Sequence, residues 1–301
     1  MSGIMRLGNV EVQVNDLDKA SQFYREVLGL QEVKRTKEKL YLKCWDEYDH
    51  HSVVLKQASG LGLVKISWKV EREQDLVDLE KKIEAYGIKV KRLSKNEELA
   101  IGEAVSFTAP SGQTMMLYHQ IEQVGRGVSM PEIYPQGIPG IAPPHLDHLV
   151  IAAEDVDETV KFLTSVLGFR ISERVVDPEG HSIFSFLFIH GKPHDIAISK
   201  GPSGKFHHFA FYLDDWNDVG RAARILAGNK MQLDVPPSKH GITRGTTTYF
   251  RDPAGNRLET FAGGYLTYPD FPTITWPVEH IQRALFSFGG PSNLEQFMEW
   301  I

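Results

Sequence analysis

The chain has 301 residues, of which 42% are hydrophobic and 24% charged, and its formal net charge is −6. This composition is typical of a soluble globular protein and excludes a disordered chain. The acidic balance gives no basic surface for nucleic acid. At roughly 150 residues per domain, the length predicts two domains.

Targeting and redox features point to the cytoplasm. The only cysteine, Cys44, excludes an internal disulfide and a thiolate metal cluster, which favours a reducing compartment. We interpret Cys44 as core filler, because it lies in an apolar run. No apolar stretch approaches the roughly 18 residues of a membrane span. The N-terminal residues lack the apolar segment of a signal peptide, so we expect neither secretion nor a membrane partner.

An internal repeat begins near the N-terminus. Residues 7–30 align without a gap with residues 146–169, at an offset of 139. Each copy predicts a strand, a turn at an aspartate and an amphipathic helix that ends at a glycine. In the second copy the turn residue is Asp155 and the closing glycine is Gly168.

Two further pairs of segments extend the repeat. Residues 62–83 align with residues 205–226, and residues 107–119 with residues 250–262, both at an offset of 143. The chain therefore consists of two halves, and each half contains two modules of strand, helix and several strands. A repeat of this length indicates that one folding unit was used several times.

The repeat defines the predicted domain boundaries. We expect an N-terminal domain at 1–123 and a linker at 124–144, since this stretch contains five prolines and four glycines. A C-terminal domain follows at 145–262, and a tail occupies 263–301. Within the tail, residues 293–301 predict one helix.

The two halves act as a control for each other. Positions that determine the fold should agree, whereas positions that carry chemistry in only one half should differ. Three aligned positions differ in this way, and the second half has metal-ligating residues at all three. The pairs, first half before second, are Asn9 and His148, Lys65 and His208, and Met116 and Glu259.

Strand geometry predicts that these side chains meet. Side chains alternate between the two faces of a strand, and the large residues Phe209 and Phe211 should pack against the helices. Alternation places His207 with them and points His208 to the opposite, concave face, together with His148. Adjacent histidines cannot both point inward, so the phase selects His208.

Two imidazoles and one carboxylate form the facial triad of non-haem Fe(II) oxygenases, which leaves three coordination positions open. One carboxylate leaves a net charge of +1 on Fe²⁺, which suits a monoanionic chelating substrate. We therefore hypothesise that His148, His208 and Glu259 bind a metal ion. Ligand type does not distinguish Fe(II) from Mn(II).

The whole chain resembles the type I extradiol ring-cleaving dioxygenases of the vicinal-oxygen-chelate superfamily, closest to the catechol 2,3-dioxygenase family. Residues 239–261 carry the most specific similarity: a histidine, a tyrosine, an Asp-Pro-x-Gly turn and a glutamate. Here His240, Tyr249 and Glu259 fill those positions. Thr248 departs from the pattern, in which an aliphatic residue is usual, and we expect it to alter packing only.

The resemblance implies an α+β fold of four βαβββ modules, two per domain, with mixed sheets forming open barrels. It implies extradiol (meta) cleavage of catechol or methylcatechols by O₂, giving 2-hydroxymuconic semialdehydes at a mononuclear Fe(II), with Mn(II) as the alternative ion. It also implies a homotetramer.

Further site residues follow from the resemblance alone. His194 corresponds to the general acid/base of the family, and His240 and Tyr249 to residues that hydrogen-bond the bound catechol. By their surroundings alone, both histidines fit loops and Tyr249 fits a strand core. By analogy with the family, four residues line the ring pocket: Phe186, Thr243, Leu285 and Phe297.

Several alternatives remain open at this point. A roomier pocket would suit a 2,3-dihydroxybiphenyl-type dioxygenase. The same modules also build glyoxalase-like isomerases, hydroxyphenylpyruvate-type dioxygenases and non-catalytic proteins that bind aromatic ligands. Among the remaining histidines, His50 and His51 lie in a charged run that predicts a solvated loop.

Overall fold

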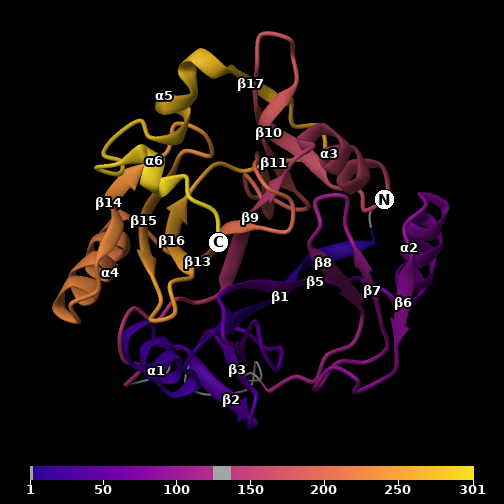
Figure 1. Ribbon diagram of the computed structural model, residues 1–301, viewed down its shortest axis with the longest axis horizontal. Coiled ribbons are helices and arrows are strands. Elements are labelled where there is room, and N and C mark those ends of the chain that lie inside the picture. The colour runs from indigo at the N-terminus through magenta and orange to yellow at the C-terminus, as the bar shows by residue number, and fades with distance from the viewer. Residues whose placement is uncertain (1–2, 125–136) are drawn as a thin grey trace.

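The computed structural model describes residues 3–124 and 137–301 and shows two large mixed sheets with few helices (Figure 1). The predicted α+β class is confirmed. The elements of the first half are β1 (Ile4–Val14), α1 (Leu17–Gln22), a π-helical turn (Phe23–Val27), β2 (Gln31–Arg35), β3 (Lys39–Lys43), β4 (Val53–Gln57), β5 (Gly62–Val70), α2 (Glu73–Ala85), β6 (Val90–Leu93), β7 (Ala104–Thr108) and β8 (Thr114–Tyr118).

The second half repeats this order of elements. They are β9 (Leu146–Ala153), α3 (Val156–Ser165), β10 (Arg170–Val176), β11 (Ser182–Phe188), β12 (Ile196–Lys200), β13 (Phe206–Leu213), α4 (Trp216–Gly228), β14 (Leu233–Lys239), β15 (Gly245–Arg251) and β16 (Arg257–Gly263). Together the halves contain four βαβββ modules, as the resemblance implied.

Strand pairing is the same in both sheets. The first sheet has the order β2-β3-β4-β1-β5-β8-β7-β6, and the second has the equivalent order β10-β11-β12-β9-β13-β16-β15-β14. The first strand of each module runs parallel to its last strand, and the first strands of paired modules run antiparallel. In the part of the chain that the structure describes, the sheets do not close into a barrel.

Local sequence explains where the helices begin and end. The Asp155 side chain caps α3 by accepting a hydrogen bond from the Glu158 amide at 2.9 Å. Gly168, just after the helix, has a φ of +79°, a left-handed conformation that glycine adopts without steric cost. Both features match the prediction from the repeat.

Equivalent amide side chains join the two halves. Gln113 of the first half donates to the carbonyls of Ala152 and Lys205 in the second half, at 3.1 and 2.7 Å. Asn256 aligns with Gln113, and it donates to the carbonyl of Gln13 and accepts from the Gly62 amide, at 2.9 and 3.0 Å. Each half therefore inserts the same kind of side chain into the corresponding site of the other, as in an isologous interface.

The main hydrophobic core also spans both halves. Phe23 of the π-helical turn contacts Phe250 on β15, with ring centroids 6.3 Å apart. The equivalent pair, Phe162 on α3 and Phe107 on β7, lies 5.8 Å apart. Cys44 is fully buried in this core, as predicted. The helix-covered faces of the two sheets thus share one core, which leaves the concave face of the second sheet free to build a site.

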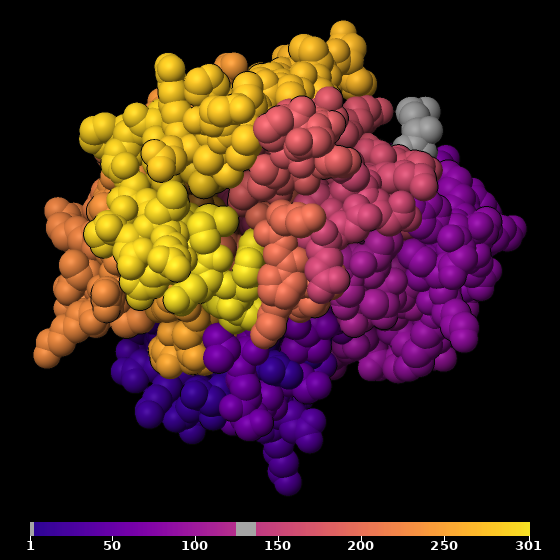
Figure 2. Space-filling model, turned by 45° about the horizontal axis from the view of Figure 1, so that its top comes forward, coloured from indigo at the N-terminus to yellow at the C-terminus, as the bar shows by residue number. Residues whose placement is uncertain are grey.

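The C-terminal tail contains more regular structure than predicted. The helix expected at 293–301 covers only α6 (Leu294–Phe297). Before it come β17 (Ile274–Pro277), a 3-10 turn (Val278–His280) and α5 (Ile281–Leu285). β17 pairs with β10 and adds a ninth strand to the second sheet. Figure 2 shows the tail, in yellow, lying over the second half.

Other expectations have mixed outcomes. The proposed linker at 124–144 falls mostly on residues 125–136, which lie outside the described part, so the domain boundaries stay a prediction.

The expectation of a solvated loop at His50 and His51 was wrong. Both imidazoles are buried and pack edge-to-face against Tyr41. The segment is held by a bridge between Asp49 and Gln123 and by the His50 amide, which donates to the Glu122 carbonyl. No helix in the described residues is long and apolar enough to cross a membrane.

The amide contacts between the halves lead to a stability prediction. Gln113→Ala removes both hydrogen bonds and leaves the buried Ala152 carbonyl and the part-buried Lys205 carbonyl without that partner, so we expect the free energy of unfolding to fall by about 1–3 kcal/mol. Denaturant unfolding measures the change. The exposed Gln74, on α2, is the control, and Gln74→Ala should stay within about 0.5 kcal/mol of the parent. Equal effects of the two substitutions would contradict a structural role for Gln113.

Candidate metal centre

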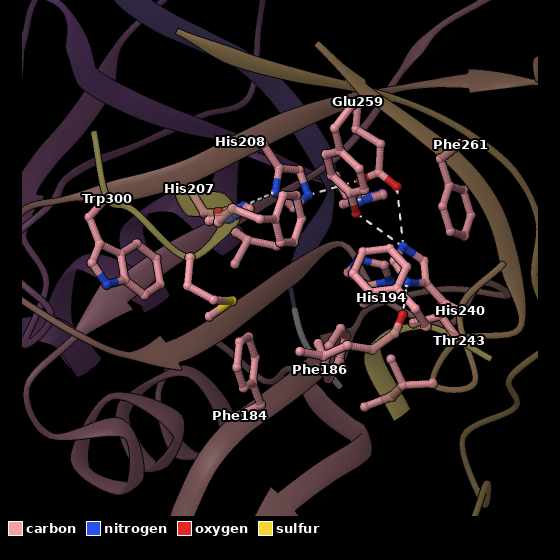
Figure 3. A pocket seen from close by; sticks show the side chains of 18 residues that line it. Phe184, Phe186, His194, His207, His208, His240, Thr243, Glu259, Phe261 and Trp300 are labelled. Carbon is pink, nitrogen blue, oxygen red and sulfur yellow. Dashed lines mark hydrogen bonds and ion pairs between the residues drawn. The ribbon is translucent and has the colours of Figure 1, made fainter. Parts of the chain in front are cut away.

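Three buried side chains from three neighbouring strands converge on one point of the concave face (Figure 3). His148 comes from β9, His208 from β13 and Glu259 from β16, and their exposed fractions are 1%, 4% and 1%. Nε2 of His148 lies 3.0 Å from Oε2 of Glu259, and Nε2 of His208 lies 2.9 Å from the same oxygen. Their ligand atoms all lie within 4.8 Å of one another.

The donor atoms fit a small divalent cation. Burial raises the pKa of Glu259, but the adjacent His208 and His148 outweigh it and hold that pKa well below its usual range. Burial lowers the pKa of His208 to about 4, so its imidazole is neutral, as a metal ligand must be. Nε2 of His208 is buried and makes no hydrogen bond although it lies beside the carboxylate. A cation between them would satisfy both groups.

Two charged residues behind the cluster, Asp147 and Lys192, orient His148. Nδ1 of His148 pairs with Oδ2 of Asp147 at 2.6 Å, and Lys192 contacts Oδ1 of Asp147 at 3.1 Å. Burial lowers the pKa of His148, but the hydrogen bonds to Asp147 and Glu259 raise it to about 9. A carboxylate on the far nitrogen keeps the near nitrogen pointed at a metal site and makes it a better ligand.

Glu259 is held by a neighbouring strand. The hydroxyl of Thr247 on β15 donates to Oε1 of Glu259. Oε1 is therefore engaged by protein, and Oε2 is the oxygen that faces the two histidines. This division favours coordination through one carboxylate oxygen.

His194 lies beside the cluster, as the resemblance implied. Its ring centroid is 4.0 Å from that of His148 and 5.2 Å from that of Phe186. Burial, reinforced by His148, holds the pKa of His194 well below its usual value, so the imidazole is neutral. Nδ1 is buried without a hydrogen-bond partner. His194 also lines the cavity, so this neutral imidazole is placed to accept a proton from a molecule bound there.

His240 and Tyr249 form a hydrogen-bonded pair on the other side of Glu259. Nδ1 of His240 donates to the carbonyl of Leu285, so a neutral imidazole accepts at Nε2 from the Tyr249 hydroxyl, 3.0 Å away. Burial, and then the charge of Glu259, raise the pKa of Tyr249 well above its usual value. The phenol therefore stays protonated and acts as a hydrogen-bond donor.

The cluster lies at the bottom of a cavity with apolar walls. The four residues predicted to line it, Phe186, Thr243, Leu285 and Phe297, all do so. Sequence reasoning missed further apolar residues of the wall. They are Val150, Phe184, Ile242, Phe261, Phe286, Met298 and Trp300. None of the lining residues is a lysine or arginine.

The prediction for His207 was wrong. It was expected on the helix-covered face with Phe209 and Phe211, yet it lines the same cavity as His208. The register between β13 and β9 shifts between Phe206 and His208, so His207 is an extra residue in a β-bulge. Phe206 takes the place in the core that alternation had given to His207.

Asp147 and Thr247 were missed although the repeat carried a signal for both. Asp147 corresponds to Gly8 at the offset of 139. Thr247 lies three residues before the third aligned segment and corresponds to Ala104 when the offset of 143 is extended to it. Both are therefore polar only in the half that holds the triad. Lys192 lies between the aligned segments 146–169 and 205–226, where the offset changes from 139 to 143, so the comparison assigns it no single counterpart in the first half.

Comparisons with known proteins agree with this geometry. The family model described as the Glyoxalase/Bleomycin resistance protein/Dioxygenase superfamily matches residues 145–260, and the one described as the catechol 2,3-dioxygenase-like N-terminal domain matches residues 65–122. The metapyrocatechase of Pseudomonas sp. (strain CF600) is 37% identical over 289 residues, 94% of each chain. The chain belongs to the type I extradiol dioxygenases.

Other extradiol dioxygenases support the same assignment. The crystal structure of the 2,3-dioxygenase LapB from Pseudomonas sp. KL28 superimposes with a TM-score of 0.89 at 39% identity, covering 93% of this chain and 99% of that one. A manganese-dependent 2,3-dihydroxybiphenyl 1,2-dioxygenase of Geobacillus genomosp. 3 is 29% identical over 95% of this chain and 94% of its own length.

The geometry of the cluster leads to a prediction about metal binding. Anaerobic Fe(II) or Mn(II) should raise the thermal unfolding midpoint of the metal-free protein, because an ion that binds only the folded state stabilises it. His208→Ala and Glu259→Ala should each abolish this shift and the retained metal, measured by elemental analysis. The exposed His181 is the matched control, and His181→Ala should keep both. Full metal retention in His208→Ala would refute the assignment.

Proposed function

We propose that this protein cleaves catechol and methylcatechols by extradiol (meta) attack of O₂, giving 2-hydroxymuconic semialdehydes. The observation that carries the proposal is the buried convergence of His148, His208 and Glu259 at the bottom of an apolar cavity. The 37% identity to a metapyrocatechase over most of both chains supports it.

The three side chains would hold the metal as a facial triad, with open positions on the cavity side. Bound iron supplies coordination sites for the diol and for O₂, and a route for electrons between them. The protein ligands contribute one negative charge, so Fe²⁺ keeps a net charge of +1 that favours a singly ionised diol. Fe(II) is our first choice, and Mn(II) is the alternative because one relative is named manganese-dependent.

His194 is proposed as the general acid and base. Its neutral imidazole lines the cavity and lies against His148, so it is placed to take a proton from the diol and to return it later. Tyr249 and His240 lie across the cluster and would bind the diol oxygens. The protonated Tyr249 hydroxyl can stabilise a negatively charged oxygen there.

The apolar walls favour a single neutral ring. Phe184 and Phe186 lie nearly parallel, with centroids 6.1 Å apart, and form one side of the space. The C-terminal residues Phe297, Met298 and Trp300 form part of the enclosure. This enclosure is why we rank catechol and methylcatechols above a 2,3-dihydroxybiphenyl.

We also propose an oligomeric state and a cellular location. The family resemblance favours a homotetramer, which light scattering of the purified protein tests directly. The single cysteine, buried and reduced, is consistent with a cytoplasmic enzyme.

A turnover assay tests the proposed reaction. Iron-loaded protein mixed with catechol in air should consume one O₂ per ring and form a yellow product, followed with an oxygen electrode and by visible absorbance. Substituting His194→Phe should lower kcat by about 10²–10⁴-fold, the usual contribution of general acid–base catalysis. Its iron content should remain unchanged. Tight binding of catechol without O₂ uptake would instead support the non-catalytic reading.

The absence of lysine and arginine from the cavity lining predicts that the preferred substrate carries no negatively charged ring substituent. A 3,4-dihydroxyphenylacetate would bring its carboxylate into the cavity without a cationic partner, and burying an unpaired charge costs several kcal/mol. We expect its kcat/KM to be at least about a hundredfold below that of 4-methylcatechol. Comparable values for the two substrates, measured by O₂ uptake, would contradict the proposed preference for an uncharged ring.

A further inference from the structure

His207 occupies a position that the two halves use differently. Both inner strand pairs contain a β-bulge at the same place, between Leu63 and Lys65 in β5 and between Phe206 and His208 in β13. The bulge is therefore a property of the fold. The extra residue is Val64 in the half without the triad and His207 in the half with it.

Hydrogen bonding restricts His207 to one tautomer. Its Nε2 lies 2.6 Å from the carbonyl oxygen of Phe297, and a carbonyl only accepts, so Nε2 carries a proton. In a neutral imidazole the other nitrogen, Nδ1, must then be an acceptor. Nδ1 of His207 lies 2.6 Å from Nδ1 of His208. His208 must therefore donate from Nδ1, which leaves the lone pair of its Nε2 facing Glu259.

The Phe297 carbonyl, which accepts the hydrogen bond from His207, lies in a segment that is held in place by other contacts. The amide and carbonyl of Ile301 pair with the carbonyl and amide of Phe206, at 2.9 and 3.1 Å. The fully buried Arg257 donates to the carbonyls of Glu299 and Gln296 from the other side, at 3.0 and 3.3 Å. The C-terminal segment is thus fixed on both sides of Phe297. In Figure 3, His207 lies between His208 and Trp300.

We propose that His207 is a positioning residue that transmits the orientation of the Phe297 carbonyl to His208, and so fixes the nitrogen that His208 offers to the metal. The inference rests on the proposed function, since it assumes that His208 is a ligand. It gives the C-terminal tail a role in the metal centre, although no tail residue belongs to the triad. His148 has a carboxylate behind it, and His207 is the corresponding partner for His208.

Three substitutions separate this role from packing. His207→Phe keeps a ring but has no hydrogen-bonding atom. His207→Asn places an amide oxygen near the position of Nδ1, so it can accept from His208 without reaching Phe297. His207→Gln places its amide near the position of Nε2, so it can donate to Phe297 without contacting His208.

The first measurement is the dissociation constant for Mn(II), determined by chelator competition under anaerobic conditions. We expect His207→Phe and His207→Gln to raise it by about 10–100-fold, the usual effect of removing the partner of a metal-ligating histidine. His207→Asn should remain within about threefold of the parent. The control substitution His181→Phe should leave the constant unchanged.

The second measurement is the imidazole N–H proton signal of His208 in the Zn(II)-loaded protein, observed by NMR with ¹⁵N-labelled histidine. A hydrogen bond to His207 slows exchange of this proton with water. The signal should persist in the parent and in His207→Asn and be lost from His207→Phe. Thermal unfolding of each variant shows whether the fold is intact.

The outcomes distinguish this inference from the proposed function. If folded His207→Phe binds Mn(II) as tightly as the parent, or if folded His207→Asn binds it as weakly as His207→Phe, the inference is overturned while the site stands. If the parent itself takes up no stoichiometric metal, the proposed function fails first.

Discussion

The site depends on one electrostatic constraint, the burial of the Glu259 carboxylate. A carboxylate that is 1% exposed must be balanced by positive charge or by donors, because an unpaired buried charge costs several kcal/mol. The Thr247 hydroxyl donates a hydrogen bond to Oε1 of Glu259, and His148 and His208 lie next to Oε2. A divalent cation at this point would offset the charge and would bind the unpartnered Nε2 of His208.

In the first half, lysine and glutamate side chains occupy the face that carries the triad in the second half. Lys65 stands where His208 stands in the second half, and it pairs with Glu11 and Glu98 at 3.3 and 2.6 Å. Lys39 adds a second cation to Glu11, at 2.9 Å. Burial raises the pKa of Glu11, but the two lysines outweigh it and lower that pKa. Lysine side chains thus occupy the concave face of the first sheet. An apolar cluster that contains Met116 lies beside them.

The C-terminal tail connects the two ends of the site. Its backbone carbonyls at Leu285 and Phe297 accept hydrogen bonds from His240 and His207, which lie on different sides of Glu259. Backbone carbonyls can only accept, so each fixes the tautomer of the histidine that it contacts. The tail also supplies Phe297, Met298 and Trp300 to the apolar wall. The same segment therefore shapes the substrate space and orients the imidazoles around it.

The sequence alone determined the repeat and the three residues of the triad, because a duplicated chain reveals where chemistry departs from architecture. The fold class followed from the resemblance of the sequence to a known family. The comparison of the two halves also carried signals at Asp147 and Thr247. Regular alternation along a strand could not place His207, since a bulge inserts one residue and reverses the phase locally.

Only the tertiary structure showed that the tail carbonyls reach the site and that His50 and His51 are buried. Backbone groups are the same at every residue, so no sequence pattern marks which of them will meet a side chain distant in the chain. Local periodicity reports on neighbours within one element. The orientation of His208 instead depends on a carbonyl about ninety residues away along the chain, and that proximity arises only when the whole chain has folded.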